Sequence, residues 1–539
     1  MSSNITRPVL FIPVREGEYV LKDEVQLSIS TQKYHVSGSP LDPNTPIKSP
    51  VPVHLQTVCF PFSEAALGKE YMEELRKVPG VHYTEEGREV PNILENYKSS
   101  KRKSYTHSSS SNFKLYRPSS RPGSSTFNPK CFISSITFYE NILRSFSNSS
   151  SLEKTYAFAN HEESFYWLDL SNSGTHSTLL RIDFHRSRPV CHHINEYTKS
   201  SKFLEIIIGF DTGDVMWYDP ISYKYLRFNK GGSFNNSPVS NIQWLPNQEN
   251  VFLVSFQNGW MIYYDKNQQE KQLYASIPEK NLKSLYLSSR GTFTVLKDFP
   301  SPDDRKPSNP IACIALSNSP INAFSISPDQ QHLAVVSERG TLKLLLYEEL
   351  GMLDVFHSYF GGLSCIAWSP DGKFIATGGK DDMLSVYSFP QRKLVARCQG
   401  HKSWVLGITF DRWRCKDDSY RIASVGLDCQ LLLWDFLVSA LHRPKSALNY
   451  VNNHVEPSKP SMNDLDDVGD LNVQSGYKGF MQNDITIHPT VSRSLIPIIS
   501  PITSYAVDRA PVTSIVFQSD CMITCSLNGR IRVWQRPLC

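Results

Sequence analysis

Apolar and polar positions alternate in short runs along most of this chain, and turns rich in Asp, Gly, Asn and Pro separate the runs. This period is typical of β-strands rather than helices. The clearest unit is Gly362–Phe389, GLSCIAWSPDGKFIATGGKDDMLSVYSF. It reads as an apolar strand ending in SPD, a second apolar strand, a tight turn containing Asp or Gly, and a third strand ending near an aromatic residue. A unit of this kind favours a repeat architecture.

The same unit recurs along the chain. Its further copies are Phe132–Asp169, Ile206–Asp219, Pro238–Asp265, Pro320–Tyr347, Gly400–Phe436 and Pro511–Trp534. A large apolar residue marks the third strand of each copy, at Leu168, Tyr218, Tyr264, Leu345, Tyr387, Trp434 and Trp534. Successive markers are 50, 46, 81, 42, 47 and 100 residues apart, and four of these gaps lie near the WD-repeat period of about 40–45 residues. Seven markers predict seven blades.

A single blade cannot cover both of its apolar faces, whereas a closed ring of blades does so and shortens the exposed edges. We therefore predict an all-β fold, a seven-bladed WD40 β-propeller. Blades 1 to 6 are expected within residues 131–436 and the final blade strands within 510–539. The two long gaps indicate insertions at about 267–310 and at 437–509, and the second is expected to be a largely disordered loop.

The end of the chain leaves one blade incomplete. Each blade should have four strands, yet the last repeat ends its third strand at Trp534, and only Gln535–Cys539 remain. We therefore expect a strand from the N-terminal extension, residues 1–130, to close the last blade, with Asn112–Arg117 and Val9–Val14 as candidates. Much of this extension is expected to be disordered, above all the Ser-rich, basic segment 99–127.

Composition narrows the function classes. Charged residues make up 20% of the chain and the formal net charge is +4, a near balance that argues against a dedicated nucleic-acid binder. The sequence contains no run of about 18 apolar residues, so it predicts no membrane insertion. Its first residues lack the pattern of a secretory signal. Eleven scattered cysteines favour a reducing compartment. We expect a cytoplasmic protein and leave nuclear entry open.

Two clusters could suggest a metal site. Cys191-His192-His193 are contiguous, and neighbours in a strand point to opposite faces, so the three side chains do not converge on one ion. Cys521 and Cys525 lie together in an apparent strand, where ordinary packing is the simpler interpretation. We therefore predict no metal site.

Motifs for other chemistry are missing. The chain has no phosphate-binding GxxxxGK[ST], no GxGxxG after a strand, no HExxH and no GxSxG. Asp381-Asp382 form a carboxylate pair, but the repeat places them in a turn, where Asp caps backbone N–H groups. No catalytic residue and no cofactor is predicted.

The sixth repeat contains a set of polar residues that resembles a proton relay. His401, Ser424, Asp428 and Trp434 are the residue types that hydrogen-bond to one another inside a WD-repeat blade. A buried Trp needs an acceptor for its indole N–H, and such a network provides one. We interpret these four residues as structural.

What remains is the surface. Rigid strands hold the loops of a propeller in place, and aromatic residues on those loops are natural anchors of a protein interface. The candidates are Phe324, Tyr359, Phe360, Trp368 and Trp404. Phe324 and Trp368 lie on inner strands, so a purely structural role in the core stays open for both.

Several strings go well beyond the general WD pattern. They are SYFGGLSCIAWSPDGKFIATGGKDD (358–382), VARCQGHKSWVLGITFDRWRC (395–415), SVGLDCQLLLWDF (424–436) and LHRPK (441–445). With these strings the chain resembles a WD-repeat family that includes the fungal carbon-catabolite-repression propellers and the animal WD-repeat activators of ubiquitin-specific proteases. The resemblance covers about 132–445 and 511–537.

The resemblance implies a function. Members of this family bind a ubiquitin-specific protease, raise its activity and help to place it in the cell, often together with a second WD-repeat protein. Phe324 and Trp368 match the family's inner-strand aromatic residues that face the protease. Recruitment to cell tips or to the division septum stays open.

Two other functions of a propeller are substrate recognition for a ubiquitin ligase and enzymatic activity. A substrate receptor of a cullin-type ubiquitin ligase often carries W-D-x-R at the end of a blade, but this chain reads Trp434-Asp435-Phe436-Leu437 there. A propeller enzyme would need a convergent nucleophile, base or metal cluster, which the sequence does not indicate.

Overall fold

The computed structural model describes most of the repeats. The described residues are 10–28, 51–60, 80–83, 114–115, 132–139, 154–170, 178–200, 203–221, 224–270, 294–297, 308–416, 418–441 and 485–537.

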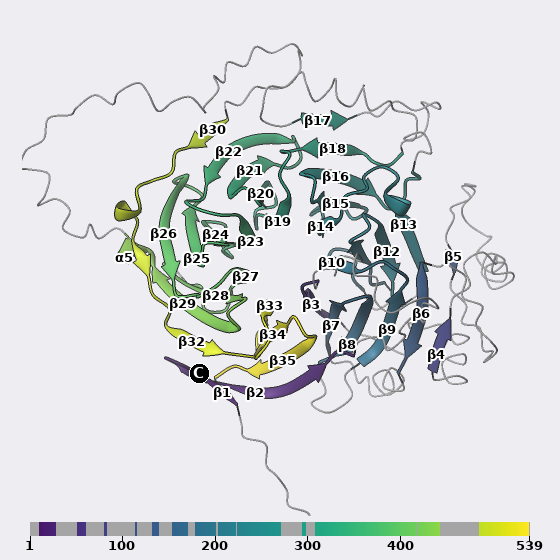
Figure 1. Cartoon of the computed structure of the whole chain (residues 1–539), viewed down its shortest axis with the longest axis horizontal. Helices are drawn as coiled ribbons and strands as arrows, with labels where there is room; N and C mark the ends of the chain where they lie inside the picture. Colours follow the sequence, from purple (N-terminus) through teal and green to yellow (C-terminus); the bar gives the residue numbers. More distant parts are fainter. Residues whose placement is uncertain are drawn as a thin grey trace, which may run out of the picture.

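Seven sheets, antiparallel except for the outermost strands of blades 4 and 5, stand in a ring, each with its first strand towards the centre and its last strand at the rim (Figure 1). From the channel outwards, the first three blades are β3 (Leu55–Phe60), β7 (Lys154–His161), β8 (Ser164–Asp169), β9 (Thr178–Phe184), β6 (Ile133–Phe138) and β4 (Gly80–Tyr83); β10 (Pro189–Ile194), β11 (Ile206–Phe210), β12 (Val215–Asp219), β13 (Lys224–Phe228) and β5 (Lys114–Leu115); and β14 (Val239–Trp244), β15 (Val251–Phe256), β16 (Trp260–Asp265), β18 (Ala312–Ala315) and β17 (Thr294–Lys297).

Blades 4 to 7 follow the same plan, with strands from distant parts of the chain at their outer edges. They are β19 (Ile321–Ile326), β20 (His332–Ser337), β21 (Thr341–Leu346), β22 (Gly351–His357) and β30 (Thr486–His488); β23 (Leu363–Trp368), β24 (Phe374–Gly379), β25 (Met383–Ser388), β26 (Lys393–Gln399) and β31 (Ile498–Ile499); β27 (Val405–Phe410), β28 (Ser419–Gly426), β29 (Gln430–Leu437) and β32 (Thr503–Ala506); and β33 (Val512–Phe517), β34 (Cys521–Ser526), β35 (Arg530–Gln535), β2 (Gly17–Gln26) and β1 (Phe11–Val14).

The predicted seven-bladed propeller is confirmed. Each of the seven marker residues lies in the third strand of its own blade, and all seven side chains are buried. They pack into apolar clusters, several of which include residues of two neighbouring blades. Within the described part of the chain, no helix has the length and apolar character needed to span a bilayer.

An N-terminal strand closes the last blade, but neither expected candidate provides it. β2 pairs antiparallel with β35, and Tyr19 and Ile12 are buried with Trp534. The candidate Val9–Val14 instead contains β1, which pairs with the outer side of β2, so it forms the rim of the blade rather than its fourth strand. β2 was missed because its alternation, GEYVLKDEVQ, is mostly polar, as suits a strand near the rim.

The second candidate lies in another blade. Within Asn112–Arg117, the structure describes β5, which pairs with β13 at the edge of blade 2. Blade 1 also differs from the expected boundary, because its innermost strand β3 comes from the N-terminal extension 1–130 and pairs with β7. The extension therefore contributes strands to blades 1, 2 and 7.

The described part of the expected loop 437–509 contains three short strands. After β29 and the short helix α5 (Val438–Leu441), the described chain resumes at residue 485. Residues 485–506, here called the strap, run along the outer edges of three blades (Figure 1). β30 pairs parallel with β22, β31 pairs parallel with β26, and β32 completes blade 6 beside β29.

Local sequence explains why the strap is ordered. Ile485, Ile499 and Tyr505 pack against the apolar clusters of successive blades. β-Branched and aromatic residues of this kind favour strands, whereas the sequence prediction followed the polar composition of the preceding residues. Most of the other segments expected to be loops lie outside the described residues. They are 99–127 (apart from β5), 452–480, and 267–310 (apart from 267–270, β17 and 308–310).

Candidate partner-binding face

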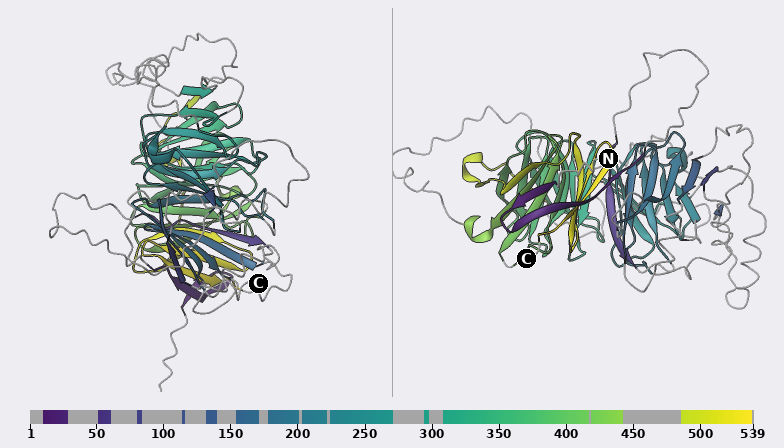
Figure 2. Two further views of the ribbon diagram at one scale, coloured as in Figure 1. Left: turned by 90° about the vertical axis from the view of Figure 1, so that its right-hand side faces the viewer. Right: turned by 90° about the horizontal axis from the view of Figure 1, so that it is seen from below.

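The two faces of the disc carry different loops (Figure 2). Because strands alternate in direction, the links between blades and the turns between second and third strands share one face, here called the link face. Backbone bonds join neighbouring loops on it, such as Ser358 N–H to the Gly340 carbonyl (2.7 Å) and Lys380 N–H to the Gly362 carbonyl (2.9 Å). A side chain on Gly340 (φ +75°) would collide with the Gly361 carbonyl. These contacts make the link face rigid.

Two aromatic side chains project from this face. Phe360, in the link between blades 4 and 5, is 71% exposed, and Trp404, in the next link, is 44% exposed. Lys380 lies between them, because it lines a hollow of about 320 Å³ with Phe360 while its ammonium nitrogen lies 4.5 Å from the centroid of the Trp404 ring. Exposed aromatic residues on a fixed backbone are suited to anchoring a protein partner.

Tyr359, the third candidate beside them, is committed to an internal contact. Its hydroxyl donates to the Val491 carbonyl of the strap. Its ring lies between the guanidinium groups of Arg397 and Arg493, 4.6 Å and 5.3 Å from the ring centroid. Burial raises the pKa of Tyr359, although both guanidinium groups oppose the shift. Tyr359 therefore holds the link that carries Phe360 against the strap.

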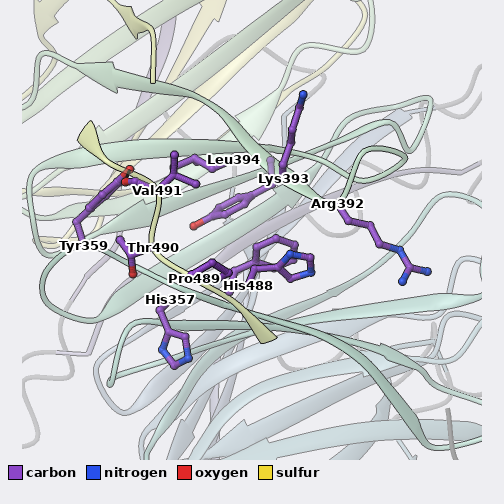
Figure 3. A pocket seen from close by; sticks show the side chains of 11 residues that line it. His357, Tyr359, Arg392, Lys393, Leu394, His488, Pro489, Thr490 and Val491 are labelled. Atoms are coloured by element: carbon purple, nitrogen blue, oxygen red, sulfur yellow. Dashed lines mark hydrogen bonds between the residues drawn. The ribbon is translucent and has the colours of Figure 1, made fainter. Parts of the chain in front are cut away.

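A small cavity of about 120 Å³ lies beneath this contact, between the strap and the outer strands of blades 4 and 5 (Figure 3). His488 of the strap stacks on Phe356 with ring centroids 4.1 Å apart, and its Nε2 lies 2.7 Å from the buried Asp354 carboxylate. In Figure 3, Tyr359 lies beside Val491 at one end of the cavity. The cavity belongs to the packing of the strap.

Phe324 and Trp368 are both buried in the ring, in agreement with the core role that the sequence left open for them, while their expected contact with the protease stays a prediction. Phe324 is 3% exposed and packs in the core beneath blades 3 and 4. Trp368 is 8% exposed, and its indole N–H donates to the Ser325 carbonyl of the adjacent blade (3.1 Å). Both side chains turn toward the packing between blades, because the inner strands are covered on each side by neighbouring sheets.

The four polar residues of blade 6 form one hydrogen-bonded network. The Trp434 indole N–H donates to Ser424 Oγ (2.8 Å), which lies 2.8 Å from His401 Nε2, and His401 Nδ1 lies 2.9 Å from Asp428. Burial lowers the pKa of His401 in spite of the bond to Asp428. A neutral ring that donates from Nδ1 and accepts at Nε2 gives every proton one acceptor. The network connects the link to the sheet and contacts no cavity that the structure describes.

We expect Ser424→Ala to lower the free energy of unfolding by roughly 2–4 kcal/mol, because it leaves His401 Nε2 and the Trp434 N–H buried without a partner. Urea denaturation would measure the loss. Thr524→Val in blade 7 is the comparison. Among the described residues, the Thr524 hydroxyl accepts one hydrogen bond, from the Trp534 indole (2.9 Å), so its loss should cost about 1–2 kcal/mol. Equal losses in the two variants would contradict the shared role of Ser424.

The residues of the two Cys- and His-containing clusters from the sequence are mostly buried. His192 contacts the Phe158 carbonyl (3.1 Å), and burial lowers its pKa well below the usual value. Burial raises the pKa of the Cys521 thiol to about 12. Among the described residues, no group of three His, Cys, Asp or Glu side chains could hold a metal ion. Asp381, from the predicted carboxylate pair, is bound by Arg397 (2.5 Å).

Comparison with known proteins agrees with the repeats. Residues 352–388 and 392–435 match the family model described as "WD domain, G-beta repeat". Over 542 aligned residues, the chain is 60% identical to a protein of Schizosaccharomyces pombe named "UBP9-binding protein bun62", covering 100% of this chain and 99% of that protein. The chain belongs to the bun62 family of WD-repeat proteins. The expected relationship to a fungal WD-repeat family is thereby confirmed.

A solved structure is also similar to this member of the bun62 family. A chain in the "Crystal Structure of Mitotic Checkpoint Complex" aligns with a TM-score of 0.44 and 11% identity, covering 71% of this chain and 84% of that chain. The likeness is too low to bear on function.

Sequence reasoning missed two parts of this face. No pattern in the sequence indicated that Lys380 lies between the two aromatic residues, because its contacts depend on the packing of adjacent blades. The strap had a weak signal in its isoleucines, but they lie far along the chain from the strands that they meet: Ile487 pairs with Val355 and Ile498 with Arg397, 132 and 101 residues apart.

Proposed function

We propose that this chain is the non-catalytic subunit of a deubiquitinating complex, which binds and activates a ubiquitin-specific protease. The observation that carries the proposal is the 60% identity, over the whole length, to a protein named for binding UBP9. The chain itself contributes binding and no bond-breaking chemistry. A second WD-repeat protein is proposed to join the same complex.

The link face supports this function. Phe360 and Trp404 are presented on links that are hydrogen-bonded to the turns of adjacent blades, so the interface needs little ordering when the partner binds. Activation then follows if the propeller binds the active conformer of the protease better than the inactive one. A tenfold rise in activity needs a preference of about 1.4 kcal/mol.

A role as a cullin-ligase receptor is less well supported. The W-D-x-R pattern is absent, and Asp435 of the Trp434-Asp435 pair is bound internally by Arg421 through two contacts of 2.7 Å. No specific feature of the described surface favours that partner over the protease.

The test uses the purified full chain with purified UBP9 of S. pombe. Size-exclusion chromatography should give a joint peak, and hydrolysis of ubiquitin–AMC by the protease should rise when the chain is added. The chain alone should release no AMC. Separate elution of the two proteins would overturn the proposed partner, and release of AMC by the chain alone would overturn its non-catalytic role.

A further inference from the structure

Three exposed cations lie in turns and links of the same face as the aromatic pair. Arg339 lies in the β20–β21 turn, Lys402 in the link that carries Trp404, and Arg509 in the link between blades 6 and 7. Within the part of the chain that the structure describes, none of the three forms an ion pair. We call this region of blades 4 to 7 the basic arc.

The acidic residues of the same turns and links do not balance the arc. Three of the acids there pair with a cation: Glu338 with Lys380 (2.5 Å), Asp381 with Arg397 (2.5 Å) and Asp508 with Arg530 (3.2 Å). The other two are Asp428, which is bound by the neutral His401 (2.9 Å), and the half-buried Asp382, so the three unpaired cations outnumber them. The charge presented to a partner is therefore positive, although the whole chain is nearly neutral.

This arrangement sets the kind of surface that fits. Two exposed aromatic residues would form the centre of an interface, and cations around them would form its rim. A basic rim attracts an acidic surface from a distance and disfavours a basic one. A nearly neutral chain can thus carry a local basic region whose preference for an acidic surface is not visible in the net charge.

We propose that the basic arc docks an acidic surface of the ubiquitin-specific protease, with Arg339, Lys402 and Arg509 guiding its approach to Phe360 and Trp404. The inference rests on the proposed function and adds the chemistry of the partner's contact surface. Solvent-exposed ion pairs contribute little to affinity. The arc therefore acts mainly on the rate of association, which depends on salt.

The experiment compares two charge-reversed chains with the wild type. One carries Arg339→Glu, Lys402→Glu and Arg509→Glu. The control carries Lys393→Glu, Arg412→Glu and Lys416→Glu, three exposed cations on the opposite face. Both variants change the net charge equally, so a general charge effect cancels. Thermal unfolding should show that both triple variants keep the wild-type midpoint.

Association with purified UBP9 is measured by stopped-flow at about 0.02 M and about 0.5 M salt, where screening is weak and strong. At low salt, the arc variant should associate about tenfold more slowly than the wild type, while the control should stay within about twofold. High salt should remove most of the difference. Equal rates for the arc variant and the control would overturn the basic arc, with the proposed function intact. If wild-type chain and UBP9 fail to associate at either salt, the proposed function itself fails.

Discussion

Replacing Phe360 and Trp404 together by alanine is expected to weaken binding to the protease by at least about a hundredfold. Aromatic anchors at the centre of an interface are each worth roughly 2 kcal/mol when truncated, and a factor of ten in affinity corresponds to about 1.4 kcal/mol. Because Phe360 is 71% exposed and Trp404 44% exposed, neither belongs to the core, and their removal leaves no cavity there. Titration calorimetry with UBP9 would measure the loss, and thermal unfolding should stay unchanged.

Two comparisons make this result specific. Trp413→Ala removes a 39% exposed aromatic side chain on the opposite face, and it should leave binding unchanged. Phe324→Ala with Trp368→Ala should instead lower stability, by about 3–5 kcal/mol for each buried ring. Wild-type affinity in the Phe360/Trp404 variant would show that the protease contacts another surface.

Deleting residues 1–26 is expected to destabilise the whole ring by roughly 6 kcal/mol or more. The deletion removes β1 and β2, with Ile12 and Tyr19 fully buried, and it uncovers the apolar side of Trp534. Burying a large apolar side chain stabilises by about 1.5–3 kcal/mol, and the ladder with β35 is lost as well. The loss is comparable with the whole stability of a typical domain, about 5–15 kcal/mol.

Thermal unfolding and size-exclusion chromatography would measure this effect. The unpaired edge of β35 should also promote association between chains. The matched control is deletion of residues 1–9, which retains both strands and should unfold like the full chain. Glu16→Gln tests a single contact of the hairpin, the ion pair of Glu16 with Arg421 in blade 6. A stable, monomeric chain without residues 1–26 would show that the ring closes by other means.

The blades were predictable because their signal is local. Marker residues such as Tyr264 and Trp434 end a short apolar strand, and their side chains are buried wherever the unit repeats. The strands that cross between blades were harder to predict. β2 and β35 lie near opposite ends of the sequence, and β2 is largely polar. Neither closeness along the chain nor an apolar alternation therefore indicated that the two strands pair.

The site was predicted in part. The five aromatic candidates included Phe360 and Trp404, the two exposed residues of the link face, but the sequence could not separate them from core residues. Trp368 and Trp404 are the same residue type, 36 positions apart, and one faces the neighbouring blade while the other faces solvent. That difference depends on where a strand ends and a link begins, which only the packed ring decides.

The strap gives blade 6 an unusual construction. The third strand of blade 6 ends at Leu437. The chain then passes the outer edges of blades 4 and 5 before the fourth strand begins at Thr503. A break in the backbone between residues 442 and 484 would therefore separate two pieces that still share this sheet. The C-terminal piece also completes blade 7 with β2 of the other piece. The sheets of blades 4 to 7 would each hold strands of both pieces, so one proteolytic cleavage there need not take the disc apart.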